Sequence, residues 1–191
     1  MSNHLELIES IASSVTAANA ADVDSGVFPQ ATIDALGEAG LLGLISAPEV
    51  GGLGQGPRAA AEVVERIARE CASSAMVTCM HFAGTAVIEQ YGDEATRRAI
   101  ASGNHLSTLA FSEAGSRSHF WAPLSTATPT DAGIQLNAHK SWVTSASHAT
   151  AYVWSSQSID AEGPSTIWLV PADVSGLTRP GPFTGLGMRG N

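Results

Sequence analysis

Apolar positions recur every three or four residues through the first hundred residues of the chain, a period typical of amphipathic helices. Three apolar faces follow this period: Leu5, Ile8, Ile11, Ala12 and Val15; then Ile33, Leu36, Ala39 and Gly40, in a helix that starts near Pro29; then Ala61, Val64, Ile67 and Ala68, within 58–69. A fourth helix is predicted over 75–91 with Ser73 or Ser74 as its N-cap, and a short fifth between Asp93 and about Gly103. The glycine-rich segment 48–57 is predicted to be a loop.

From residue 105 the pattern changes to alternating polar and β-branched positions, which predicts strands. We expect them at 106–111, 123–128, 133–137, 140–145, 150–156 and 165–170, with a hairpin turn at Asp131-Ala132-Gly133. The fold class is therefore α+β: an all-α helical domain over 1–104 and a mostly antiparallel β domain over 105–191.

Composition and charge exclude several function classes. Charged residues make up 14% of the chain and hydrophobic residues 44%, which is typical of a packed protein. The net charge of −9, with no basic stripe, argues against nucleic acid and anionic membranes as partners. No apolar run is long enough to span a bilayer and no signal peptide is evident, so we expect a cytoplasmic protein with free thiols at Cys71 and Cys79.

Two short segments carry the candidate chemistry. Residues 109–118 form a β-like run that ends in small and hydroxyl residues, and such a stretch can direct N–H and hydroxyl groups toward an anionic ligand. Residues 137–144 place Trp142 two positions before Thr144, so that both face one side if the segment is an extended strand. A flat ring beside a hydrogen-bonding group suits a planar heteroaromatic cofactor.

Both segments resemble the flavin-binding motifs of the acyl-CoA dehydrogenase family. That family reads roughly Thr-Glu-Pro-x-Ala-Gly-Ser-Asp, which aligns without a gap with 112–119, and Asn-Gly-x-Lys-x-Trp-Ile-Thr, which aligns with 137–144. Further similarity lies at 40–44, 48–54 and 186–190, so the resemblance covers the whole chain. It implies a barrel-like β domain and a C-terminal helix bundle that is missing here, because family members continue for about as many residues again.

The resemblance implies FAD as the cofactor and gives individual residues roles. Leu109, Phe111 and Ser112 would contact the edge of the isoalloxazine ring, while Trp142 would cover the ring and Thr144 would hydrogen-bond near its N5 atom. Ser118 would lie beside the phosphates of the flavin and of the substrate. The alternatives are an ordinary strand with a polar end for 109–112, a plain loop serine at Ser118 and a core tryptophan at Trp142.

Three positions depart from the family pattern: Ala114 replaces proline, Arg117 replaces glycine and His119 replaces aspartate. Arg117 adds a cation beside the expected phosphate site, although Arg117 and His119 could equally form a solvated loop edge. Lys140 is the only lysine, so a lysine-rich phosphate clamp is excluded. The histidines show no metal-ligand spacing, and core or surface roles are expected for them. Met76, Met80 and Phe82 are expected in the core, with a wall of the acyl pocket as the alternative.

The reaction implied for the complete protein is the α,β-desaturation of an acyl thioester carried by coenzyme A or an acyl-carrier protein. A carboxylate would remove the α-proton while a hydride passes to the flavin. The family's base lies in the missing half, so no catalytic residue is assigned and the chain alone is expected to be inactive. Partners would be an electron-transfer flavoprotein and either further copies or a complementary C-terminal subunit. The alternatives are a flavin-dependent monooxygenase or N-oxygenase of the same fold, and a non-catalytic interaction module.

Overall fold

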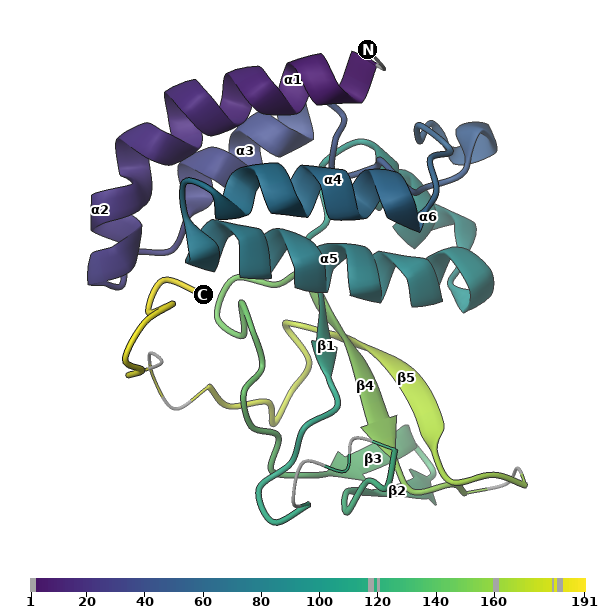
Figure 1. Ribbon diagram of the computed structural model, residues 1–191. Coiled ribbons are helices and arrows are strands. Elements are labelled where there is room, and N and C mark those ends of the chain that lie inside the picture. The colour runs from purple at the N-terminus through teal and green to yellow at the C-terminus, as the bar shows by residue number, and fades with distance from the viewer. Residues whose placement is uncertain (1–2, 117–118, 120, 160–161, 180, 182–183) are drawn as a thin grey trace.

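The computed structural model describes residues 3–116, 119, 121–159, 162–179, 181 and 184–191. In the described residues the α-helices pack together, with α1 and α3 above α4 and α5, and two small β-sheets lie beneath α5 (Figure 1). The order of elements confirms the predicted fold class, a helical part followed by a β part. The C-terminal residues return to the helices, where Arg189 donates hydrogen bonds to the backbone carbonyl and the carboxylate of Asp24.

The helical domain begins with one long helix that contains a π-helical segment. Its parts are α1 (Asn3–Ile11), η1 (Ala12–Thr16) and α2 (Ala17–Ser25). The elements that follow are α3 (Gln30–Glu38), the 3₁₀ helix η2 (Pro48–Val50), α4 (Pro57–Ala68), α5 (Ala72–Tyr91) and α6 (Glu94–Ala101). Asp93 caps α6, because its carboxylate accepts a hydrogen bond from the Thr96 N–H at 2.8 Å. The predicted loop at 48–57 therefore contains one short helical turn.

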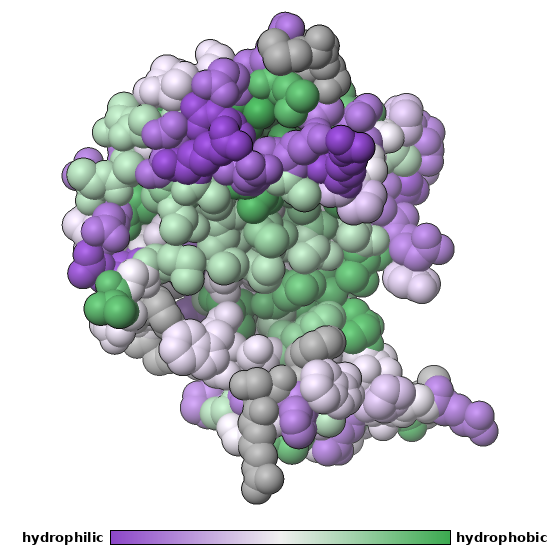
Figure 2. Space-filling view, in the orientation of Figure 1, coloured by the Kyte–Doolittle hydropathy of each residue, from purple (hydrophilic) through white to green (hydrophobic). Residues whose placement is uncertain are grey.

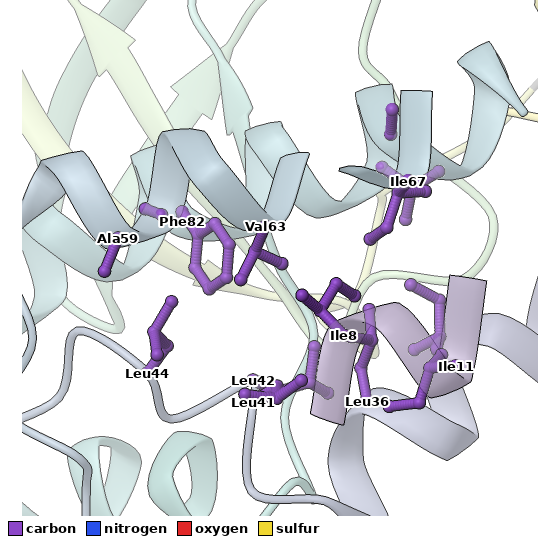
Figure 3. Close-up of a cluster of buried hydrophobic side chains, with 14 of the residues drawn as sticks. Ile8, Ile11, Leu36, Leu41, Leu42, Leu44, Ala59, Val63, Ile67 and Phe82 are labelled. Atoms are coloured by element: carbon purple, nitrogen blue, oxygen red, sulfur yellow. The ribbon is translucent and has the colours of Figure 1, made fainter. Parts of the chain in front are cut away.

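A single apolar core joins α1, α3, α4 and α5 with the segment after α3. Figure 3 shows Ile8 and Leu36 meeting Val63 of α4 and Phe82 of α5, beside Leu41, Leu42 and Leu44. Most of these side chains are fully buried, and each contributes roughly 1.5–3 kcal/mol relative to an exposed position. The helical spacing in the sequence therefore reports a real shared core.

Two details of the helix prediction were wrong. The buried face of α4 carries Ala59, Ala60, Val63 and Ile67, whereas Ala61 and Ala68 are exposed. Ser73 and Ser74 do not cap α5; both are buried inside its first turn, and the N-cap position is Cys71. Alanine carries little information about which face is buried, and the hydroxyls of this helix turn inward, which a pattern based on polarity cannot foresee.

The strands form two separate sheets. The first has the order β1-β4-β5, with β1 (Ser107–Ala110) parallel to β4 (Ala151–Ser156) and β4 antiparallel to β5 (Thr166–Pro171). The second is the hairpin of β2 (Thr126–Thr130) and β3 (Gly133–Asn137), which confirms the predicted turn. Among the described residues these sheets do not close into a barrel, so the expected barrel-like shape is only loosely met.

The strand predicted over 140–145 is wrong. Only Lys140 forms a β-bridge, with Glu113, and residues 144–148 form consecutive turns. Trp142 and Ser145 have φ angles of 57° and 60°, in the left-handed region, so the segment cannot be extended. The expectation that Trp142 and Thr144 share one face of a strand therefore does not hold.

His81 connects the helical domain to the first strand. The imidazole is fully buried; its Nδ1 accepts the Ser107 N–H at 3.1 Å and its Nε2 lies 2.9 Å from the Leu42 carbonyl, to which it donates. Burial lowers the pKa of His81 to about 4, because the charged ring would lose its hydration. His81 is thus a neutral core histidine, one of the two roles that the sequence analysis left open.

This pKa predicts a loss of stability in mild acid. Between pH 6.5 and about 4 the unfolded chain binds a proton at His81 and the folded chain does not, so stability is complete above this range and falls as the pH falls. We expect His81 to account for a loss of about 3 kcal/mol in the free energy of unfolding near pH 4. Urea unfolding of the wild type and of His81→Gln, which keeps a donor and an acceptor, measures the difference. Identical pH profiles for the two proteins would contradict the assignment.

Candidate functional site

The two sequence motifs lie side by side although about thirty residues separate them. The Ser141 N–H donates to the Ser112 carbonyl at 2.9 Å, and the Ala114 N–H donates to the His139 carbonyl at 3.1 Å. Between these bonds Glu113 and Lys140 form an antiparallel bridge. The end of β1 and the segment before Trp142 are therefore held together as one surface.

The outer edge of β1 has peptide groups without a hydrogen-bond partner among the described residues. Leu106 directs its carbonyl to Thr150 on the β4 side, and Ser112 directs its carbonyl to Ser141 on that same side. Peptide groups alternate along an extended chain, so those of Leu109 and Phe111 point the other way, as does the Ser107 N–H that meets His81. The edge at Leu109 and Phe111 therefore offers N–H and C=O groups to a ligand.

A buried ion pair lies directly between the two motifs. The Lys140 ammonium is 2.5 Å from Oε1 of Glu113, and the two side chains are 4% and 2% exposed. The ammonium also donates to the Ser155 carbonyl at 2.7 Å. The Glu113 carboxylate accepts further hydrogen bonds from the Ser125 hydroxyl and from the N–H groups of Leu124 and Ser125. Every carboxylate oxygen is thus paired, which is the condition for keeping a charge in the interior.

The surroundings keep this pair ionised. Burial alone would raise the pKa of Glu113, yet the hydrogen bonds from Lys140, Ser125 and Leu124 outweigh it and the pKa lies below its usual value. Burial lowers the pKa of the Lys140 ammonium, and the Glu113 carboxylate opposes that effect. A carboxylate held in this way is a poor proton acceptor, so Glu113 is unsuited to act as a general base.

Residues 142–148, which we call the 142–148 turn, follow the ion pair. The Thr144 carbonyl accepts a hydrogen bond from the Thr108 hydroxyl at 2.7 Å, which ties the turn to β1. The ring of His148 stacks on Phe28 with centroids 3.8 Å apart, which ties it to the helical domain. The side chain of Trp142 is 74% exposed, whereas Thr144 is half-buried.

The turn borders a wide groove of about 1690 Å³ between the helices and the sheets. Met76 and Met80 line one wall, and Trp142, Tyr152 and Trp154 line another. Phe82 faces away into the helical core. No aspartate or glutamate is among the described lining residues, whereas Lys140, Arg179 and Arg189 are, in a chain of net charge −9. Glu113 balances the charge of Lys140 and Asp24 that of Arg189, whereas Arg179 has no carboxylate partner among the described residues. The groove therefore suits an apolar ligand, or an anionic group near Arg179.

The predicted site residues have the following positions. Leu109, Phe111 and Ser112 are half-buried at the end of β1, and Trp142 and Thr144 lie in the turn at the groove. Ser118 and Arg117 lie outside the described residues, so the phosphate role of Ser118 stays a prediction. His139 and Trp154 line the groove; Trp154 is buried, and Trp121 is 56% exposed.

Three contributors were missed by sequence reasoning. Lys140 was available as a signal, because a single lysine within an apolar and hydroxyl-rich segment is unusual, but the pattern does not identify Glu113 as its partner. Thr108 and Tyr152, which hold the turn, carry no motif that could have identified them. Both cysteines are free thiols. In the described ranges, no group of histidine, cysteine and acidic side chains could hold a metal ion, and no helix is long and apolar enough to cross a membrane.

A helical domain joined to small sheets, with two motifs meeting at a strand edge, defines the N-terminal and middle portions of an acyl-CoA dehydrogenase-type protein. Residues 4–103 match the model of the acyl-CoA dehydrogenase N-terminal domain, and residues 108–191 match that of the middle domain. The chain belongs to the acyl-CoA dehydrogenase family.

Relatives are found both by sequence and by structure. The chain is 28% identical to a probable acyl-CoA dehydrogenase, YngJ, of Bacillus subtilis, over 97% of this chain and 51% of that protein. It is 31% identical to the human mitochondrial short-chain specific acyl-CoA dehydrogenase, over 90% and 44%. The chain therefore spans about half the length of the curated relatives it matches.

Two solved structures share the fold. The butyryl-CoA dehydrogenase of Megasphaera elsdenii superposes with a TM-score of 0.87 at 20% identity, covering 98% of this chain and 52% of that one. A nitrososynthase of Micromonospora carbonacea var. africana superposes with a TM-score of 0.79 at 27% identity, covering 98% and 50%. The same fold thus occurs in a protein named as a dehydrogenase and in one named as a nitrososynthase.

The ion pair generates a stability prediction. Lys140→Met leaves the Glu113 carboxylate buried without its cation, so we expect a loss of about 3–5 kcal/mol in the free energy of unfolding. The double variant Glu113→Gln, Lys140→Met removes both charges and should be more stable than the single one. Arg98→Met, which removes an exposed pair with Glu94, is the control and should cost under about 1 kcal/mol. Denaturant unfolding of the four proteins decides, and equal losses for Lys140→Met and Arg98→Met would refute the prediction.

Proposed function

We propose that this chain supplies the isoalloxazine-binding part of an FAD-dependent acyl-CoA or acyl-carrier-protein dehydrogenase. The observation that carries the proposal is the meeting of the two motifs: the first lies at the end of β1, and the second, beside it, lines a wide groove. Family membership and the names of the relatives support the same class of reaction. The whole protein's substrate and partners are part of this proposal, because the chain spans only about half of its relatives.

The residues present fit a flavin. The free peptide groups of Leu109 and Phe111 and the hydroxyl of Ser112 suit the polar edge of the isoalloxazine ring, which alternates donors and acceptors. Trp142 offers an exposed aromatic ring, and Thr144 offers a hydroxyl; both residues line the groove. Arg179, a lining cation without a carboxylate partner among the described residues, suits an anionic group of the cofactor. Ser118 would contact phosphate groups of the flavin and of the substrate.

When bound, the flavin would accept the hydride that leaves the β-carbon of the acyl thioester. The chain's own residues would hold and orient the ring, donate hydrogen bonds to it and keep water from its buried side. Proton removal from the α-carbon requires a carboxylate in another part of the protein. Both carboxylate oxygens of Glu113 already accept hydrogen bonds. Glu62, on α4, is paired with Arg58 and with His4 of α1, and it does not line the groove.

The outer face of α5 supports a further protein contact. Ala72, Met76, Cys79, Ala83 and Ala86 recur at helical spacing and are exposed or half-buried, with no charge among them. Figure 2 shows the resulting apolar band across α4 and α5. A helix that is apolar all round is normally covered. We propose that the continuation of the chain, or a complementary C-terminal subunit, covers this face, with further copies and an electron-transfer flavoprotein as partners of the assembly.

A second function on the same fold is a flavin-dependent monooxygenase or N-oxygenase. The observation that favours it is the 27% identity to a nitrososynthase over 98% of the chain. The two reactions are distinguished by the part of the relatives that this chain does not span. A carboxylate placed there at the substrate's α-carbon favours the dehydrogenase, and its absence favours the oxygenase. A non-catalytic interaction module would bind no flavin at all.

The first test is flavin binding. We expect the 191-residue chain to bind FAD only weakly, because association costs several kcal/mol and contacts to the adenine side are not supplied by the two motifs. A titration followed by flavin fluorescence measures the affinity. We also expect no flavin bleaching when the chain, excess FAD and acyl-CoA of several lengths are mixed anaerobically. A stoichiometric flavin spectrum after dialysis, or bleaching with enoyl product, would contradict these expectations.

The second test concerns the turn. In the full-length protein Thr144→Val removes one hydrogen bond to the cofactor, for an expected loss of roughly 0.5–1.5 kcal/mol in FAD binding. Trp142→Ala should cost more, because ring contact area is lost as well. Thr144→Ser and Trp121→Ala are the controls, since one keeps the hydroxyl and the other removes an exposed ring that does not line the groove. Unchanged flavin affinity in both test variants would show that the turn does not face the cofactor.

A further inference from the structure

The 142–148 turn holds a conformation that its residues do not prefer. Trp142 and Ser145 both have positive φ angles, 57° and 60°, and neither is a glycine. Side chains with a Cβ atom rarely adopt this region, and they keep it only where the surroundings fix the backbone. Two such residues bracket Thr144, so the direction of Thr144 depends on whatever holds the turn.

Thr108 holds the carbonyl of Thr144, which lies between these two residues. Its side chain is fully buried in β1, and its hydroxyl donates to the Thr144 carbonyl at 2.7 Å. Orienting the carbonyl of Thr144 orients the peptide that joins it to Ser145, where the left-handed conformation occurs. A bond from a rigid strand therefore fixes the peptide plane beside the proposed cofactor contact.

Tyr152 holds a second carbonyl, two residues further along. Its side chain is 2% exposed, and its hydroxyl donates to the Ala146 carbonyl at 2.5 Å. The same hydroxyl accepts a hydrogen bond from Nε of Arg179 at 2.7 Å, which leaves its proton directed to Ala146. The turn's intermediate carbonyl, that of Ser145, is occupied by the backbone N–H of Ala149 at 2.8 Å.

Thr108 and Tyr152 are also partners in the sheet. They face each other in the parallel register of β1 and β4, so their side chains project from the same face of the sheet. Neighbouring positions on two paired strands are among the most rigid platforms a fold offers, because both backbones are fixed by the ladder. Two carbonyls of one strained turn, those of Thr144 and Ala146, are thus fastened to a single rigid site.

We propose that Thr108 and Tyr152 are positioning residues that set the 142–148 turn in its flavin-binding geometry. They act through Thr144 and Trp142, because both hydroxyls are engaged by carbonyls of the turn. The inference rests on the proposed function for the cofactor, while the hold on the turn itself rests on the hydrogen bonds alone. Without these hydroxyls the turn would relax toward ordinary backbone angles, and the Thr144 hydroxyl and the Trp142 ring would lose their direction.

The test uses Thr108→Val and Tyr152→Phe, which keep shape and lose only a hydroxyl, with Thr108→Ser as the matched control that keeps it. Hydrogen exchange in the 191-residue chain reports the turn without any flavin. We expect the amides of His148 and Ala149, which bond to Ser145, to exchange faster in both variants, while the amides of β4 change little. Thr108→Ser should match the wild type.

The second measurement uses the full-length protein with FAD. Each variant should weaken FAD binding by roughly twofold to tenfold, the size expected for one net hydrogen bond, and should shift the midpoint potential of the bound flavin. A purely structural role would lower stability without moving the potential, and that outcome would overturn the proposal. Unchanged exchange in the turn for both variants would overturn it as well.

The two arms separate this inference from the proposed function. If wild-type full-length protein binds no FAD, the proposed function fails, and the cofactor part of the inference fails with it. If the wild type binds FAD and the variants bind it equally well with an unchanged potential, the proposed function stands and the positioning role is refuted. Tyr152→Phe keeps the test decisive if Thr108→Val does not fold.

Discussion

The buried ion pair between Glu113 and Lys140 is the constraint on which the β domain depends. It joins the end of β1 to the segment that leads into the 142–148 turn. Through Ser155 it reaches β4, and through Ser125 it reaches the start of the β2–β3 hairpin. An interior charge is tolerable only when its partner is in place, so this pair strongly disfavours any other register of the four segments. Two motifs far apart in sequence thereby acquire one relative position.

Helix α5 fixes the position of β1 relative to the helical domain. Gly84 allows β1 to approach closely, because a Cβ there would lie 2.9 Å from the Cβ of Ser107. One helical turn earlier, His81 bonds Ser107 on one side and Leu42 on the other. The joint between the domains is therefore polar and directional rather than a sliding apolar contact, and it fixes the direction in which β1 leaves the helices.

The sequence was sufficient for what depends on periodicity and motif. Helix positions, the hairpin and the α+β order follow from local patterns, and the family resemblance brought Ser112 and Trp142 to attention before their proximity was visible. It failed at 140–145, where alternation predicts a strand but the ion pair and the bond from Thr108 impose a turn. Left-handed residues that are not glycine leave no trace in a pattern, because tertiary contacts create them. The partner of Lys140 is invisible for the same reason.

The arrangement separates the geometry of a binding site from its affinity. The strand edge at Leu109 and Phe111 and the held turn are formed by contacts within this chain, so their orientation needs no ligand and no further domain. Affinity depends instead on the area of ligand that is enclosed, and the groove is wide and open while the apolar face of α5 is uncovered. Residues that are already held in the binding geometry lose little conformational entropy when a ligand or another part of the protein encloses the site. Under the proposed function, enclosure and proton removal are the tasks that this surface does not perform, whereas its shape is set by contacts among its own residues.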